Sequence, residues 1–251
     1  MANTTEWDFY FCTIEDKPAS IMVDLALKSA SPIADKAEFI QISVSLRQPN
    51  EHGLTTPAEA ETLYVMEDRL AEHLAQNLQG VYAGRNTHNG KRIFYFYTAS
   101  AIDYAGVVAE VMDSFPTHTY ELENFVDPEW AFFEQFLFPS QVEYQSILNR
   151  RVLEKLKENG LTASDTQEVE HFLYFYSETA REMFLERIAQ DNFRVIGKGY
   201  TEASARPPYS LVLVREDKMD TQTIDAVVLY LIQAAEHCQG EYDGWGTAVA
   251  N

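Results

Sequence analysis

The residue types that most often carry chemistry are scattered along this chain and form no known catalytic pattern. The sequence has no glycine-rich phosphate loop, no His-Glu-x-x-His helix, no cysteine pair at ligand spacing and no Gly-x-Ser-x-Gly turn. Acidic residues are so frequent that pairing any two as acid and base carries no information. The histidines do not cluster as metal ligands usually do: His52, His73, His88, His118, His171 and His237. We therefore expect no catalytic residues, no metal site and no cofactor.

The chain as a whole is strongly acidic. Its formal net charge is −20 at pH 7, and residues 1–126 and 127–251 contribute equally to it. Such a surface repels phosphate backbones and anionic membranes, which argues against direct binding of nucleic acid or of a membrane. It favours a basic protein partner instead. The alternative, that the charge only keeps the protein soluble, stays open.

Length and composition indicate a folded protein of two domains. The chain has 251 residues, of which 46% are hydrophobic and 13% aromatic, so each half can bury its own core. No apolar run approaches the length of a membrane span, and residues 1–6 lack the basic and apolar regions of a signal peptide. We expect a cytoplasmic protein in which Cys12 and Cys238 stay reduced.

The most distinctive stretch is Gly240–Thr247, which follows a strongly amphipathic helical pattern. Gly240 is predicted to be the C-cap of that helix, because glycine adopts a left-handed conformation at low cost. Glu241 and the residues after it are predicted to form a strand. A turn or bulge is expected at Asp243-Gly244.

The same stretch supplies four candidate partner-binding residues. Two of them combine an apolar ring with a polar edge, and two are carboxylates: Tyr242, Trp245, Glu241 and Asp243. Aromatic side chains beside a carboxylate form the kind of surface that binds a basic partner. Alternatively, Trp245 anchors the last strand on a helix and Asp243-Gly244 only shapes the bulge.

Glu170 and His171 are the other two candidate partner-binding residues. Adjacent residues of a strand face opposite sides of the sheet, so these two side chains cannot act together on one substrate. One of them is therefore expected to pair with a neighbour or to cap a loop while the other packs. Contact with a partner stays open as the functional alternative.

The elements that would position these candidates follow a repeated order. The predicted strands of the first half are Trp7–Glu15, Ser20–Leu27, Phe39–Leu46, Val81–Thr87, Arg92–Thr98 and Thr117–Phe125. A helix from the N-cap Thr56, with Glu59 completing a capping box, to Gly80 follows the third strand. A second helix lies between Ser100 and Pro116. From Phe39 onward this order is the split βαβ, ferredoxin-like plan, with two extra strands before it.

The second half is predicted to repeat that plan, which gives an α+β protein of two ferredoxin-like antiparallel sheet domains. The domains are expected at 1–126 and 140–251, and the aromatic connector 127–139 is expected to pack between them or against one of them. The predicted elements of the second half are a helix over Gln141–Asn159, a strand over Phe172–Tyr176, a helix capped by Ser177, strands Phe193–Thr201 and Ser210–Val214, a helix capped by Asp220, and the final strand.

Residues 145–251 resemble the family of the regulator of ribonuclease E activity B. The resemblance lies in Gly240–Thr247, and in Leu156–Gly160 followed by Val169-Glu170-His171. Members of that family are intracellular bacterial proteins that bind the RNA-degrading endonuclease. The resemblance implies a non-enzymatic, protein-binding regulator of RNA decay with a ribonuclease E-like endonuclease as partner.

The first half resembles a bacterial domain of unknown function, family 695. The match lies in the opening Trp7-Asp8-Phe9-Tyr10 and in the order of strands and helices. That domain is sometimes fused to the regulator-like domain, and the resemblance implies no chemistry. Two other functions stay open: a small-molecule-binding or enzymatic pocket near Tyr95, Tyr97 and Tyr104, and a self-associating structural module. The oligomeric state is not predicted.

Overall fold

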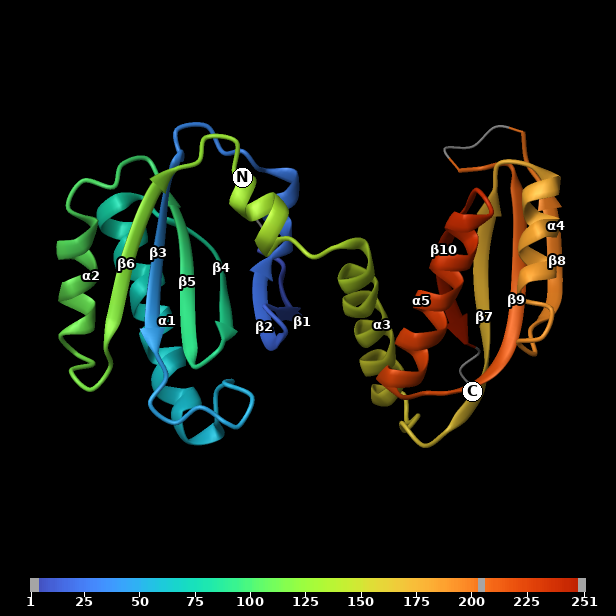
Figure 1. Cartoon of the computed structure of the whole chain (residues 1–251), viewed down its shortest axis with the longest axis horizontal. Helices are drawn as coiled ribbons and strands as arrows, with labels where there is room; N and C mark the ends of the chain where they lie inside the picture. The colour runs from blue at the N-terminus through green and yellow to red at the C-terminus, as the bar shows by residue number, and fades with distance from the viewer. Residues whose placement is uncertain (1–4, 203–205, 248–251) are drawn as a thin grey trace. The chain divides into compact units, whose positions relative to one another are not determined.

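The structure is a computed structural model that describes residues 5–202 and 206–247. The chain divides into two compact units, Met1–Tyr144 and Gln145–Asn251, which are described separately below (Figure 1). Each unit contains one antiparallel sheet and its own helices. The prediction of a two-domain α+β protein is therefore confirmed.

Unit 1 contains a six-stranded sheet in the order β1-β2-β4-β5-β3-β6. The strands are β1 (Trp7–Ile14), β2 (Lys17–Asp24), β3 (Glu38–Ser45), β4 (Val81–His88), β5 (Lys91–Thr98) and β6 (Tyr120–Val126), and the helices are α1 (Pro57–Leu78) and α2 (Tyr104–Met112). The part from β3 to β6 has the ferredoxin-like order β4-β5-β3-β6, and the hairpin β1–β2 is added beside β4. This arrangement confirms the predicted plan with two extra strands.

The two faces of this sheet are covered differently. Helices α1 and α2 cover one face, where Leu63, Leu70 and Val108 pack on apolar residues of β3 and β5. The other face is covered by the aromatic segment 127–138, which contains the short helix η2 (Phe133–Leu137). Trp130 stacks on Tyr97 with ring centroids 3.9 Å apart. The aromatic connector therefore packs against the sheet of unit 1.

The ends of helix α1 differ from those predicted. The Thr56 side chain makes no capping hydrogen bond and donates instead to the carbonyl of Gln48. The Glu59 carboxylate accepts the backbone N–H groups of Arg47 and Gln48, at 2.7 and 3.0 Å, and so holds the preceding loop rather than closing a capping box. At the other end the left-handed residue is Gln79, with φ of 51°, one residue before the predicted Gly80.

Unit 2 contains a four-stranded sheet in the order β10-β7-β9-β8, which is the ferredoxin-like order again. Its elements are α3 (Gln141–Glu158), β7 (Thr166–Phe175), α4 (Glu178–Arg187), β8 (Arg194–Tyr200), β9 (Tyr209–Lys218), α5 (Thr221–His237) and β10 (Gly240–Thr247). Strand β7 begins at Thr166, six residues before the predicted start, because it pairs with β9 along its whole length. The predicted N-caps Ser177 and Asp220 both accept a backbone N–H.

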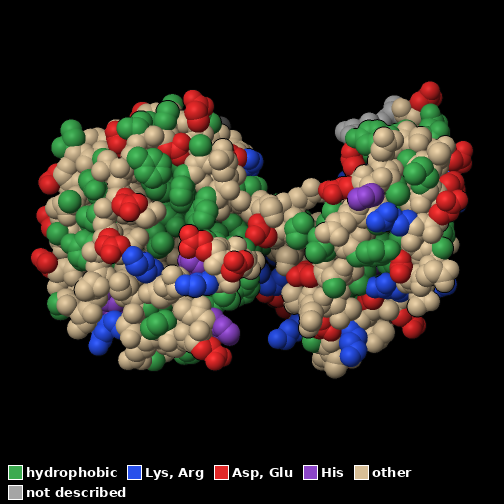
Figure 2. Space-filling view, viewed as in Figure 1, with side chains coloured by type: hydrophobic (Ala, Val, Ile, Leu, Met, Phe, Trp, Pro, Cys, Tyr) green, Lys and Arg blue, Asp and Glu red, His purple; other side chains and the backbone are tan. Residues whose placement is uncertain are grey.

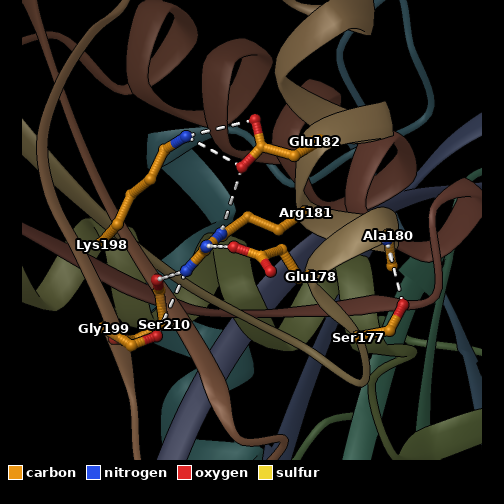
Figure 3. Close-up of polar contacts among 8 residues, drawn as sticks. All are labelled: Ser177, Glu178, Ala180, Arg181, Glu182, Lys198, Gly199 and Ser210. Atoms are coloured by element: carbon orange, nitrogen blue, oxygen red, sulfur yellow. Dashed lines mark hydrogen bonds and ion pairs between the residues drawn. The ribbon is translucent and has the colours of Figure 1, made fainter.

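Helix α4 is tied to the sheet of unit 2 by a buried arginine (Figure 3). The Arg181 guanidinium donates from Nη1 to the carbonyls of Gly199 on β8 and Ser210 on β9, at 3.2 and 3.3 Å. Glu178 and Glu182 on the same helix lie at 3.1 and 3.6 Å from its Nη2 and Nε. These contacts hold the edge strand β8 to the rest of the unit, so we assign them to stability.

Candidate protein-binding surface

Strand β7 separates Glu170 from His171. Along this strand the odd-numbered residues from Val169 to Phe175 are buried against the helices, and the even-numbered residues face the other side of the sheet. Glu170 is exposed, whereas His171 is 0% exposed. The prediction that the two side chains face opposite sides is confirmed, and a partner can therefore contact Glu170 but not His171 directly.

His171 has a structural environment. Its Nδ1 lies 2.9 Å from the Tyr242 hydroxyl on β10, and its ring packs edge-on against Phe193. Its Nε2 has no hydrogen-bond partner among the described residues. Burial, and then the nearby positive charge of Arg215, lower the pKa of His171 to about 3. The imidazole is therefore neutral at physiological pH and links β7 to β10.

Strand β10 contains the predicted bulge but not the predicted cap. The register with β7 shifts between Tyr242 and Gly244, and Gly244 has φ of 138°, so the bulge is confirmed. Gly240 is instead the first residue of the strand, and helix α5 ends at His237 with Cys238 as its C-cap. A Cβ on Gly240 would lie 2.5 Å from Cδ1 of Phe175, so close packing rather than helix capping requires a glycine there.

Trp245 and Tyr242 both point toward the helices of unit 2. The Trp245 indole N–H donates to Oδ1 of Asn149 on α3 at 2.8 Å. Asn149 is 1% exposed and donates from Nδ2 to Asp225 on α5 at 2.8 Å. Trp245 thus joins β10 to α3 and α5 through one polar network. Of the two alternatives for this residue, the geometry supports the anchor.

The opposite side of the sheet, which we call the outer face, carries the exposed candidates. On it Glu170 lies beside Glu168, and Glu241 accepts the Tyr176 hydroxyl at 2.5 Å. Carboxylates outnumber cations on this face: Glu168, Glu170, Glu216, Glu241 and Asp243 against Arg194, Arg206 and Lys218. Three of the six sequence candidates therefore lie together on an acidic, partly aromatic surface.

Two ion pairs neutralise part of the negative charge of the outer face. Arg206 pairs with Asp243 at 2.7 Å and lies over the Tyr174 ring, 5.2 Å from its centroid. Arg194 pairs with Glu168 on β7. Both pairs are exposed and contribute little to stability. Among the carboxylates named for this face, Glu170, Glu216 and Glu241 are therefore the ones left to meet a cation from outside.

A hollow of about 500 Å³ lies at one end of the outer face. It is lined by Glu168, Asp191, Asn192, Arg194, Val214, Arg215 and Glu216. Arg215 pairs with Asp217, and Asp191 accepts the Tyr230 hydroxyl at 2.5 Å, so most of its charged groups already have partners. Sequence reasoning did not single out this end of the sheet, although the alternation of β7 places Glu168 on the same face as Glu170.

The three tyrosines of the alternative pocket, Tyr95, Tyr97 and Tyr104, do not lie on one face of the sheet of unit 1. Tyr95 and Tyr97 are 2% and 0% exposed and lie under Phe132, Phe136 and Trp130. Tyr104 packs against the core on the other face of the sheet. The three tyrosines are therefore core residues rather than the lining of one cavity.

Charge is dispersed over the surface of both units. Figure 2 shows acidic and basic side chains interspersed over the visible face of each unit. Among the described residues, none of the helices combines the length and the apolar character that a membrane span requires.

Two family models match the chain. Residues 5–138 match the family of unknown function DUF695, and residues 146–247 match the model described as Regulator of ribonuclease activity B. Both matches confirm the resemblances seen in the sequence. No curated protein matches the chain.

Several solved structures also match the chain. A crystal structure of an unknown protein from Galdieria sulphuraria is 10% identical, and the comparison covers 85% of this chain and 99% of that chain. Its TM-score is 0.23, and we draw no conclusion from it.

Proposed function

The chain belongs to the DUF695 family of unknown function, and we propose that the regulator-like unit after that domain is a non-enzymatic regulator that acts by binding a ribonuclease. The observation that carries the proposal is the match of residues 146–247 to the regulator of ribonuclease activity B. The resemblance of Gly240–Thr247 and Glu170-His171 to that family supports a ribonuclease E-type endonuclease as the proposed target.

The outer face suits a basic protein partner. Glu170, Glu241 and Asp243 supply carboxylates, and the Tyr174 and Tyr176 rings supply amphipathic contact area. RNA-binding surfaces of nucleases are basic, because they must neutralise phosphates. Carboxylates on this face would compete with RNA for the same lysine and arginine side chains, which gives the regulator a way to act without breaking bonds.

The first test measures binding of the full chain to a purified ribonuclease E-type endonuclease by surface plasmon resonance. We expect saturable binding that weakens as salt rises from 50 to about 300 mM, since salt screens exposed charges. The variant Glu170→Lys/Glu241→Lys should weaken binding by about tenfold or more, because each change replaces an attraction by a repulsion. No binding by the unaltered chain would contradict the proposal.

A matched control separates the outer face from charge in general. Glu236 is exposed on α5, on the helical side of the sheet. Glu236→Lys changes the net charge as Glu170→Lys does and should leave the affinity within about twofold. Equal weakening by Glu236→Lys and Glu170→Lys would mean that bulk charge, rather than this face, sets the affinity.

A further inference from the structure

A second site lies in unit 1, beside helix α1. Helices α1 and α2 cover the part of the sheet formed by β3 and β5, but the hairpin β1–β2 extends the sheet beyond them. In the register of β1, β2, β4 and β5, Phe9, Met22, Arg85 and Phe94 form one row on the helix-covered face. A pocket of about 310 Å³ opens where this face passes the edge of α1.

Arg92 on β5 is a buried cation that lines this pocket. Its side chain is 4% exposed, its Nε donates to the Thr87 hydroxyl at 3.2 Å, and its Nη2 donates to the Thr55 hydroxyl at 3.0 Å. Its Nη1 has no hydrogen-bond partner among the described residues. Burial, and then the neighbouring charge of Arg85, lower the pKa of Arg92 to about 10. A buried donor of a charged group without an acceptor is costly.

The nearest carboxylate is already occupied. Nη1 of Arg85 donates to both carboxylate oxygens of Glu67 on α1, Oε1 at 2.6 Å and Oε2 at 2.5 Å. Glu67 also accepts the Tyr82 hydroxyl at 2.9 Å. Its distance to Arg92 Nη1 is 3.9 Å, which is too long for a hydrogen bond. Two guanidinium groups therefore share one carboxylate, and the pocket is a positive site in a strongly acidic protein.

Aromatic rings complete the walls. The Cζ atoms of Arg85 and Arg92 each lie 5.5 Å from the centroid of the Tyr64 ring, so the ring covers both cations. Tyr64 is 51% exposed, and Phe9 and Phe11 on β1 are 39% and 65% exposed. All three line the pocket. Large apolar side chains are seldom left this exposed side by side unless something binds to them.

We infer that this pocket binds a small organic anion, with a carboxylate or phosphate group accepting from Arg92 and an apolar or aromatic part lying against Phe9, Phe11 and Tyr64. Hydroxyls of Ser20, Thr55 and Thr87 line the same wall and supply further donors. The volume lies at the lower end of the range for small-ligand sites, roughly 300–1,000 Å³. The inference concerns the DUF695 unit and does not depend on the proposed ribonuclease target.

Calorimetric titration of the full chain tests the inference with benzoate, phenyl phosphate and neutral benzamide. Benzoate or phenyl phosphate should bind saturably and about tenfold or more tightly than benzamide, because all three can accept from Arg92 but only the anions also pair a negative charge with it. The anion that binds more tightly shows whether the pocket prefers a carboxylate or a phosphate head group. Binding of both anions no tighter than benzamide would overturn the inference.

Two pocket variants and a control locate the binding. Arg92→Lys keeps the charge but loses the planar guanidinium group. Tyr64→Ala removes an exposed wall of the pocket without opening the core. Each change should lower the affinity for the anion by about tenfold. Arg69 lies on α1, like Tyr64, but outside the pocket lining. Arg69→Met should therefore leave the affinity for the anion within about twofold of that of the unaltered chain. Circular dichroism checks that each variant is folded. Affinity unchanged in both pocket variants would also overturn the inference.

Discussion

At the scale of single residues, buried polar contacts account for two of the six candidate partner-binding residues. His171 and Trp245 both point away from the outer face, and each makes its hydrogen bond inside unit 2. Carboxylates that looked unremarkable in an acidic sequence, such as Glu168, lie instead beside the exposed candidates. Residue type alone indicated where recognition chemistry could occur, but burial decides which side chains a partner can meet.

His171 makes stability depend on pH in a defined direction. Its pKa is about 3 in the folded protein against an ordinary 6.5, so protons bind preferentially to the unfolded chain between these values. The stabilisation is complete above pH 6.5 and is lost as pH falls below it. The free energy of unfolding, measured by urea denaturation, should fall between pH 7 and pH 5. In the variant His171→Gln this fall should be smaller by about 2 kcal/mol than in the unaltered chain. An unchanged pH dependence would show that another group is responsible.

Trp245 can be tested as an anchor. Trp245→Phe keeps most of the ring but removes the N–H that donates to Asn149, so the free energy of unfolding should fall by about 1 kcal/mol. Affinity for the ribonuclease should stay within about twofold, because the ring faces the helices. A variant of full stability with affinity reduced tenfold would instead make Trp245 a direct contact.

At the scale of elements, Gly240 allows β10 to lie close against the Phe175 ring of β7. A Cβ at this position would meet the Phe175 ring at 2.5 Å, and Phe175 is fully buried against Phe184. Gly240→Ala should therefore destabilise the protein by about 1–3 kcal/mol in denaturant unfolding. Gly246→Ala on the same strand has no atom within 4 Å of the new Cβ and should cost less than about 0.5 kcal/mol. Equal effects of the two changes would contradict this packing argument.

Local pattern predicted most elements because their signals are short-range. The Ser177 and Asp220 caps and the bulge at Asp243-Gly244 each depend on residues close in sequence. The start of β7 was not predicted, because Thr166–Val169 gain strand structure from pairing with β9. The anion pocket was not predicted either, since Arg92 and Phe9 approach only through the pairing of β2 with β4.

At the scale of the whole molecule, two units with the same strand order differ in what covers their sheets. Both units have the ferredoxin-like strand order, but unit 1 covers the second face of its sheet with the aromatic segment 127–138, whereas unit 2 leaves acidic residues exposed on that face. Under the proposed function, the net charge of −20 and this exposed face together favour a basic partner over RNA itself. Function thus depends on what covers each sheet, which strand order alone does not determine.

The most direct test of the regulatory proposal is the cleavage rate of a purified ribonuclease E-type endonuclease on a defined RNA, titrated with the full chain. We predict a rate that falls saturably as the chain is added, with Glu170→Lys/Glu241→Lys shifting the midpoint to about tenfold higher concentration and Glu236→Lys leaving it within twofold. A cleavage rate that stays constant up to saturating concentrations of the unaltered chain would contradict the account.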